Sequence, residues 1–62
     1  MADKTKVLIE KTFLELLAER PIAKISVKYL TERCGVNRNT FYYHYKGIPQ
    51  LTESIVEQIS TE

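Results

Sequence analysis

The chain has 62 residues, 27% of them charged, and a formal net charge of +1, so it is expected to form one domain with a small core. Ligand clefts usually need about 300 Å³ or more, so an enclosed active site or a cofactor pocket is not expected in a chain of this size. With a single cysteine no intrachain disulfide can form, no cysteine and histidine set has metal-ligand spacing, and the longest apolar run is three residues, far short of a membrane span.

The first predicted helix covers about residues 4–19. Its apolar residues recur with the i, i+4, i+7, i+8 spacing of one helical stripe, namely Ile9, Phe13, Leu16 and Leu17. Pro21 then disfavours helical geometry at the residue before it. We therefore expect a connection after this helix, and we expect it to add Ile22 and Ile25 to the core.

Two short helices are predicted next, over about residues 27–34 and 38–46. Ser26 is a suitable N-cap for the first of them, because its hydroxyl can accept a bond from an unpaired backbone N–H. The inner face of that helix is expected to hold Val27, Leu30 and Cys34. Gly35 can supply the positive φ that commonly ends a helix. Asn37 is the N-cap of the following helix, which we expect Gly47 to end.

A fourth helix is predicted over about residues 49–60. Pro49 fits its first turn, where the missing N–H costs nothing. Leu51, Ile55 and Ile59 repeat every four residues, and we expect Ile55 and Ile59 to be exposed. The predicted fold class is therefore all-α: one small helical bundle over residues 1–62, with a homeodomain-like core of three helices and the start of a fourth.

Positive charge is concentrated in the middle of the chain. Residues 20–46 contain six basic residues and one acidic residue, whereas residues 1–19 contain three lysines and four acids. Residues 47–62 contain three acids and no lysine or arginine. A basic segment of this kind attracts polyanions, of which nucleic acid is the commonest in the cell.

The helix predicted at residues 38–46 combines a core face with a polar, aromatic face. At 100° per residue, Phe41 and Tyr45 lie one turn apart and are expected in the core. The residues expected on the opposite side are Asn39, Tyr43 and Lys46, flanked by Arg38, Thr40, Tyr42 and His44. Their hydroxyl, imidazole and ammonium groups can donate to phosphate oxygens, and Arg38 and Asn39 have the two-pronged groups that read guanine and adenine edges. Two helices joined by a short turn containing glycine, the second exposing such groups, are typical of a helix-turn-helix, whose second helix enters the major groove of DNA.

The segment "ISVKYLTERCGVNRNTFYYHYKGIPQL" resembles the DNA-binding domain of the tetracycline-repressor (TetR) family of bacterial transcriptional regulators. The likeness lies in the Ser-Val start, the Gly-Val turn and the Thr-Phe-Tyr-Tyr-His-Tyr-Lys helix, and it covers about residues 7–57. It implies sequence-specific binding of double-stranded DNA by part of a transcriptional regulator, most often a repressor. By this resemblance Arg38 and Asn39 meet base edges and Tyr43 lies against bases or sugars. The residues implied to bind phosphates are Ser26, Lys28, Thr40, Tyr42, His44 and Lys46.

The chain also departs from the family pattern. Ile48 stands where a lysine is common, and Pro49 and Gln50 stand where acidic residues or Lys-Glu are common. Members of the family use a C-terminal helical domain to dimerise and to bind a small inducer. We expect that domain and its inducer site to be absent from this chain. The chain is therefore expected to be a monomer, and the full-length parent a homodimer on a palindromic operator in the cytoplasm, at the bacterial nucleoid.

These residues also suggest two other functions. A small three-helix module could use the tyrosine-rich face to bind a partner protein, because aromatic residues and arginine also mark interface hot spots. Salt distinguishes the two functions, since phosphate binding weakens steeply with ionic strength. Catalysis by Ser26 and His44 is not favoured, because no acidic residue lies nearby in sequence to orient the imidazole. We therefore expect neither an enzyme nor a cofactor or metal site, and Cys34 is expected to pack in the core.

Overall fold

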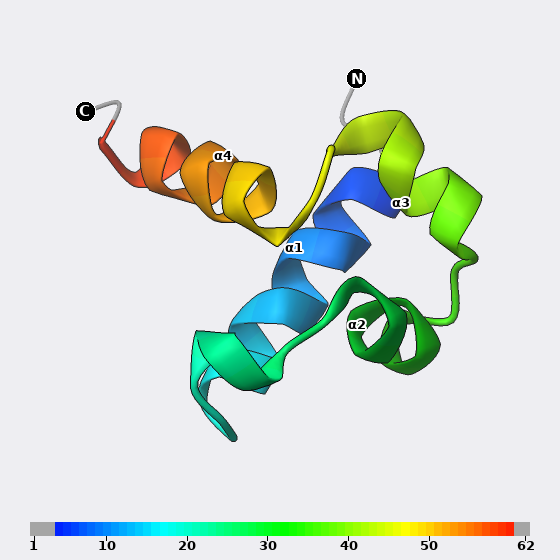
Figure 1. Cartoon of the computed structure of the whole chain (residues 1–62). Coiled ribbons are helices and arrows are strands. Elements are labelled where there is room, and N and C mark those ends of the chain that lie inside the picture. The colour runs from blue at the N-terminus through cyan, green and yellow to red at the C-terminus, as the bar shows by residue number, and fades with distance from the viewer. Residues whose placement is uncertain (1–3, 61–62) are drawn as a thin grey trace.

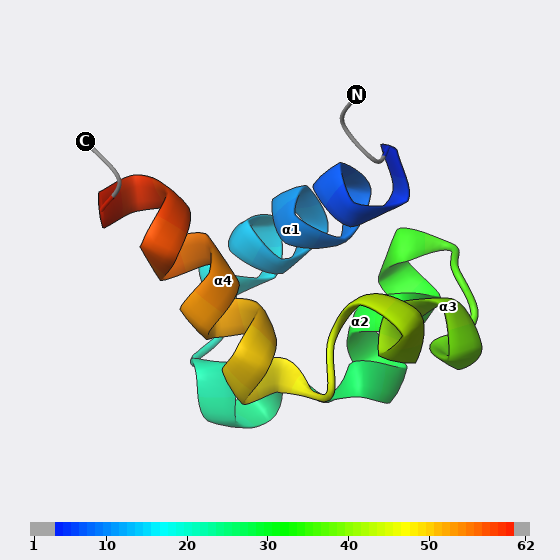
Figure 2. The same ribbon diagram turned by 90° about the horizontal axis from the view of Figure 1, so that it is seen from above.

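A computed structural model of the chain describes residues 4–60. This part contains the helices α1 (Lys4–Leu17), α2 (Val27–Cys34), α3 (Arg38–His44) and α4 (Ile48–Ser60), with a short 3-10 helix, η1 (Ile22–Lys24), between α1 and α2. Both views of the ribbon place α4 on the left and the pair of α2 and α3 on the right (Figures 1 and 2). Residues 4–60 contain no strand, and the prediction of an all-α bundle is confirmed.

All four helices and the connection before α2 contribute to one core. Its buried apolar residues are Ile9, Phe13, Leu16, Ile25, Leu30, Phe41, Tyr45, Leu51 and Ile55. Burial of a side chain of this size typically stabilises a fold by about 1.5–3 kcal/mol. The core therefore fixes α3 against the other helices through Phe41, which lies on α3, and through Tyr45, which directly follows α3.

Three apolar positions differ from the sequence-based expectation. Leu17 is 37% exposed and Ile22 is 44% exposed, since Leu17 lies 100° around the helix from buried Leu16 and Ile22 lies on a surface connection. Ile55, expected at the surface, is buried because it lies one turn from Leu51 on the same stripe, whereas Ile59 is 72% exposed. The structure also buries one polar residue, Thr31, whose hydroxyl donates to the carbonyl oxygen of Val27 at 2.8 Å.

The expected signals at the start of α2 and between α2 and α3 are confirmed. The Ser26 hydroxyl oxygen accepts a hydrogen bond from the Tyr29 N–H at 3.1 Å, and the Asn37 side chain accepts one from the Thr40 N–H at 2.8 Å. Gly35 ends α2 with a φ of +85°, a conformation that only glycine adopts at little cost. Gly35 and Asn37, which lie between the two helices, fix the angle at which α3 leaves α2.

The end of α3 differs from the prediction. The helix stops at His44, because Tyr45 has an extended backbone with φ −140° and ψ 148°. Gly47, expected to end the helix, does not have a positive φ, and Lys46 lies in the connection to α4. The other helix ends differ slightly, since α1 ends at Leu17 and α4 begins at Ile48.

Candidate nucleic-acid interface

The surface of α3 divides into a buried side and an exposed side. Phe41 is fully buried, whereas the side chain of Tyr43 is 85% exposed and that of Tyr42 is 52% exposed. Arg38 and Asn39 are also exposed, at the first two positions of the helix, while Thr40 and His44 are half-buried. The helical phase predicted from the sequence is therefore confirmed, and α3 presents two tyrosines, an arginine and an amide to solvent.

Aromatic contacts hold the exposed tyrosines in place. The ring of Tyr42 meets the buried Phe41 ring edge to face, with centroids 5.4 Å apart and planes at 84°. Tyr43 and His44 make a second edge-to-face pair at 5.1 Å and 82°. A pair that includes a buried ring, such as Phe41 and Tyr42, adds about 0.5–1.5 kcal/mol beyond simple burial. The Phe41 ring thus anchors one side of the exposed surface, and the phenol of Tyr43 stands furthest into solvent.

The start of α2 supplies two further candidate residues. Ser26 and Lys28 are both exposed. The Ser26 oxygen caps the helix by accepting from Tyr29, and its hydroxyl hydrogen can still be donated to a ligand. Because backbone N–H groups and the helix dipole favour anions at a helix N-terminus, a phosphate would be stabilised beside these side chains.

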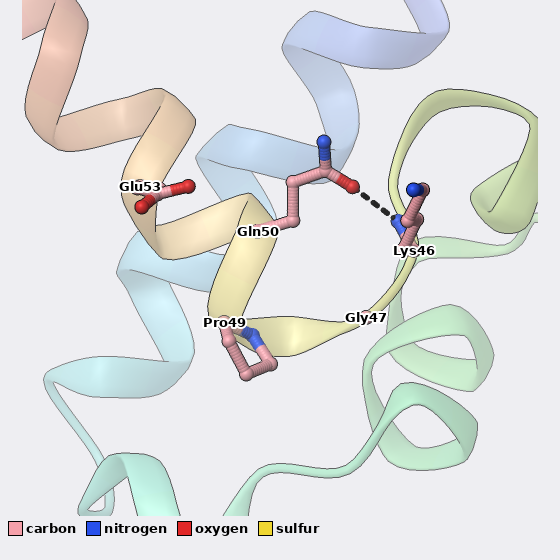
Figure 3. Close-up of a pocket in the computed structure, with 5 residues that line it drawn as sticks. All are labelled: Lys46, Gly47, Pro49, Gln50 and Glu53. Atoms are coloured by element: carbon pink, nitrogen blue, oxygen red, sulfur yellow. Dashed lines mark hydrogen bonds between the residues drawn. The ribbon is translucent and has the colours of Figure 1, made fainter.

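Lys46 is placed by the connection and not by the helix. Its backbone N–H donates to the side-chain oxygen of Gln50 at 2.7 Å, as Figure 3 shows. Its side chain is exposed. The hollow beside it, about 400 Å³ and lined by Lys46, Gly47, Pro49, Gln50 and Glu53, is open to solvent. An open hollow does not bury most of a ligand's surface as a cofactor pocket does.

Two arginines of the basic segment, residues 20–46, contact Tyr29 and Glu19 in a cluster that was not predicted from the sequence. The guanidinium carbon of Arg20 lies 4.3 Å from the ring centroid of Tyr29. Arg33 donates to the Tyr29 hydroxyl at 3.0 Å and to the Glu19 carboxylate at 3.4 Å. The hydrogen bond that Arg33 donates to the Glu19 carboxylate raises the pKa of Arg33, and the bond to the Tyr29 hydroxyl acts in the same direction.

This cluster changes which positive charges are available. Two of the six basic residues of the segment bind tyrosine or carboxylate groups of the chain itself. The other four are exposed, namely Lys24, Lys28, Arg38 and Lys46. No simple signal in the sequence reveals the cluster, because it depends on how the turn after α1 folds back onto α2.

Other kinds of site find little support in the part of the chain that the structure describes. Within residues 4–60, no group of three or more histidine, cysteine, aspartate or glutamate side chains is placed to hold a metal ion. No helix among the same residues is both long enough and apolar enough to span a membrane. Cys34 is half-buried and packs against the core, as the sequence predicted.

Comparison with known proteins identifies the relatives of the chain. Residues 11–55 match the family described as bacterial regulatory proteins, tetR family. The chain is also 30% identical over 60 residues to the uncharacterized HTH-type transcriptional regulator YxbF of Bacillus subtilis (strain 168). That alignment covers 95% of this chain and 16% of YxbF, so the chain spans about a sixth of the length of this relative. No solved structure matches the chain significantly.

Proposed function

The chain belongs to the tetR family of bacterial regulatory proteins, a class of regulators and not of enzymes, and on that premise we propose that it binds double-stranded DNA sequence-specifically. In this proposal α3 enters the major groove while the start of α2 contacts the DNA backbone. The protein would then be the DNA-binding part of a transcriptional regulator, acting at the chromosome in the bacterial cytoplasm.

The observation that carries the proposal is the exposed side of α3. Tyr43, with 85% of its side chain exposed, stands directly opposite the buried Phe41. A large aromatic residue gains nothing from the core in that position, whereas it can stack on or bond to a nucleic acid. Arg38 and Asn39, exposed on the same helix, add the groups that recognise base edges.

The proposed contacts divide into two classes. Arg38 and Asn39 lie at the N-terminal end of α3, which is the end that meets base edges in helix-turn-helix proteins. We assign these two residues, with Tyr43, to the bases. Six other residues are assigned to phosphates, namely Ser26, Lys28, Thr40, Tyr42, His44 and Lys46. Among them Lys28 and Lys46 are exposed cations, so they should contribute most to the salt dependence of binding.

The arrangement on DNA is also a proposal. One helix-turn-helix reads only a few base pairs, so two copies on a palindromic operator are needed for a specific site. The exposed large apolar residues of α4 are Val56 and Ile59, too few for the roughly 1,200 Å² that a stable interface buries. We therefore expect the 62-residue chain to be a monomer and its full-length parent to be a homodimer. A regulator that occupies its operator in this way blocks other proteins from the site, which favours repression.

A salt series tests the function. The chain is titrated with duplex DNA at increasing salt, and log K should fall linearly with log salt at a slope of several units, since each neutralised phosphate contributes about 0.9. The variant Lys28→Gln removes one proposed phosphate contact, so it should reduce the magnitude of that slope by about one. Binding to a protein partner with little salt dependence, and none to DNA at low salt, would instead support the interaction module.

A further inference from the structure

One carboxylate on α1 joins the end of α3 to α4. Glu10 accepts a hydrogen bond on Oε2 from the Tyr45 hydroxyl at 2.6 Å and from the Ser54 hydroxyl at 3.4 Å. The side-chain amide of Gln58 donates to both oxygens, at 3.1 Å to Oε1 and 3.2 Å to Oε2. Hydrogen bonds to an ionised carboxylate are about twice as strong as bonds between neutral groups. Glu10 is therefore the shared acceptor of three side chains that lie 35 to 48 residues further along the chain, one directly after α3 and two on α4.

Tyr45 links Glu10 to the proposed DNA-binding surface. It is the residue directly after α3, its ring is buried, and it lies 5.6 Å from the ring of Phe41. Its backbone N–H donates to the Phe41 carbonyl oxygen at 2.9 Å, closing the last turn. Its neighbours in the sequence are His44 and Lys46, both assigned to phosphates above. The position of Tyr45 therefore sets the backbone positions of His44 and Lys46.

The attachment of α4 depends on the same carboxylate. Only Leu51 and Ile55 among the described residues of this helix are buried apolar residues. Val56 and Ile59, further along, are exposed. The bonds from Ser54 and Gln58 to Glu10 thus add polar contacts between α4 and α1. Oε2 of Glu10 accepts hydrogen bonds both from Tyr45 and from Ser54 and Gln58 of α4. A displacement of α4 therefore alters the bond between Glu10 and Tyr45.

We propose that Glu10 is a positioning residue for DNA binding, which holds the C-terminal end of α3 through Tyr45 and couples it to the position of α4. This inference rests on the proposed function. It concerns a residue that does not touch DNA and whose negative charge opposes DNA binding. Positioning and charge therefore predict opposite results for the same substitution.

The test is Glu10→Gln, measured against Glu15→Gln as a matched control. Both residues lie on α1 and both substitutions remove one negative charge, but Glu15 is exposed and lies outside the hydrogen-bond network of Glu10. Affinity is measured at low salt with random-sequence duplexes of about two helical turns, at a temperature where circular dichroism shows every variant folded. Glu15→Gln should bind as well as the unmodified chain or slightly better. Glu10→Gln should bind about threefold to tenfold more weakly.

Tyr45→Phe keeps the ring in the core and removes only the hydroxyl, so it tests the proposal even where Glu10→Gln folds poorly. It should weaken DNA binding by a similar factor. With phenylalanine at position 45, the further change Glu10→Gln should no longer weaken binding, because the bond it removes is already absent. Amide hydrogen exchange at Tyr45 should accelerate in Glu10→Gln and in Gln58→Ala but not in Glu15→Gln.

The outcomes separate the two proposals. If the unmodified chain does not bind DNA at low salt, the proposed function fails. If it binds DNA, and Glu10→Gln matches Glu15→Gln in both affinity and exchange, the positioning role of Glu10 is wrong. A loss of melting temperature in Glu10→Gln without a loss of affinity would also overturn it, since Glu10 would then only stabilise the fold.

Discussion

Phe41 and Tyr43 are two residues apart on α3, yet alanine should lower mainly the stability at the first position and mainly the DNA affinity at the second. The Phe41 side chain is fully buried and contacts the rings of Tyr42 and Tyr45, with centroids 5.4 Å and 5.6 Å away. Truncation of a buried phenylalanine costs about 3–5 kcal/mol. A domain of this length has a total stability of only about 3–9 kcal/mol. Phe41→Ala should therefore lower the melting temperature by about 12 °C or more, or leave the chain largely unfolded.

Tyr43→Ala removes a side chain that is 85% exposed, so its stability should change by about 0.5 kcal/mol or less. The free energy of binding to duplex DNA should nevertheless weaken by about 1–3 kcal/mol, because the ring and hydroxyl that we propose contact the DNA are lost. Melting is followed by circular dichroism, and DNA binding is titrated well below both transitions. Comparable thermal destabilisation by the two substitutions would show that Tyr43 is buried and that the orientation of α3 is wrong.

Three further outcomes follow from the structure. Arg38→Ala should cost about 1–3 kcal/mol on a selected DNA site and little on random DNA, whereas Lys46→Ala should weaken both alike and reduce the salt slope by about one; identical behaviour of the two would refute the assigned roles. Gly35→Ala should lower stability by about 1–2 kcal/mol in chemical denaturation, because the φ of this residue is +85°. The control Gly47→Ala should be nearly neutral, since the added Cβ meets Pro49 at an ordinary 3.6 Å, and an equal loss at both positions would contradict the account of the turn. Two copies joined by a linker should bind a palindrome about 10²–10⁴ times more tightly than one copy, with almost no gain on a single half-site; nanomolar binding by the unlinked chain would contradict the monomer.

Local signals were sufficient to predict most of the fold. Ser26, Gly35 and Asn37 act within a few residues of their own position, so their roles as caps and helix end could be recognised without the structure. The separation of Phe41 from Tyr43 follows from helical periodicity alone. Both kinds of inference need no knowledge of what lies across the core.

Contacts between distant segments could not be predicted in this way. The end of α3 depends on Tyr45, whose hydroxyl binds Glu10 from the first helix, 35 residues earlier. The ion pair of Arg33 with Glu19 engages one of the six basic groups that the sequence places in residues 20–46. The DNA contacts assigned to individual side chains remain predictions, because they depend on a ligand whose position the chain alone does not define.

The most direct test of the DNA-binding surface is a nuclear magnetic resonance titration of the labelled chain with duplex DNA at low salt. The account predicts that the largest changes occur at the backbone amides of Arg38–His44 in α3 and at residues 26–28, where α2 begins. The exposed face of α4 that carries Val56 and Ile59 should change little. Changes centred on α4, with the amides of α3 unaffected at saturation, would contradict the claim that α3 is the element that enters the DNA groove.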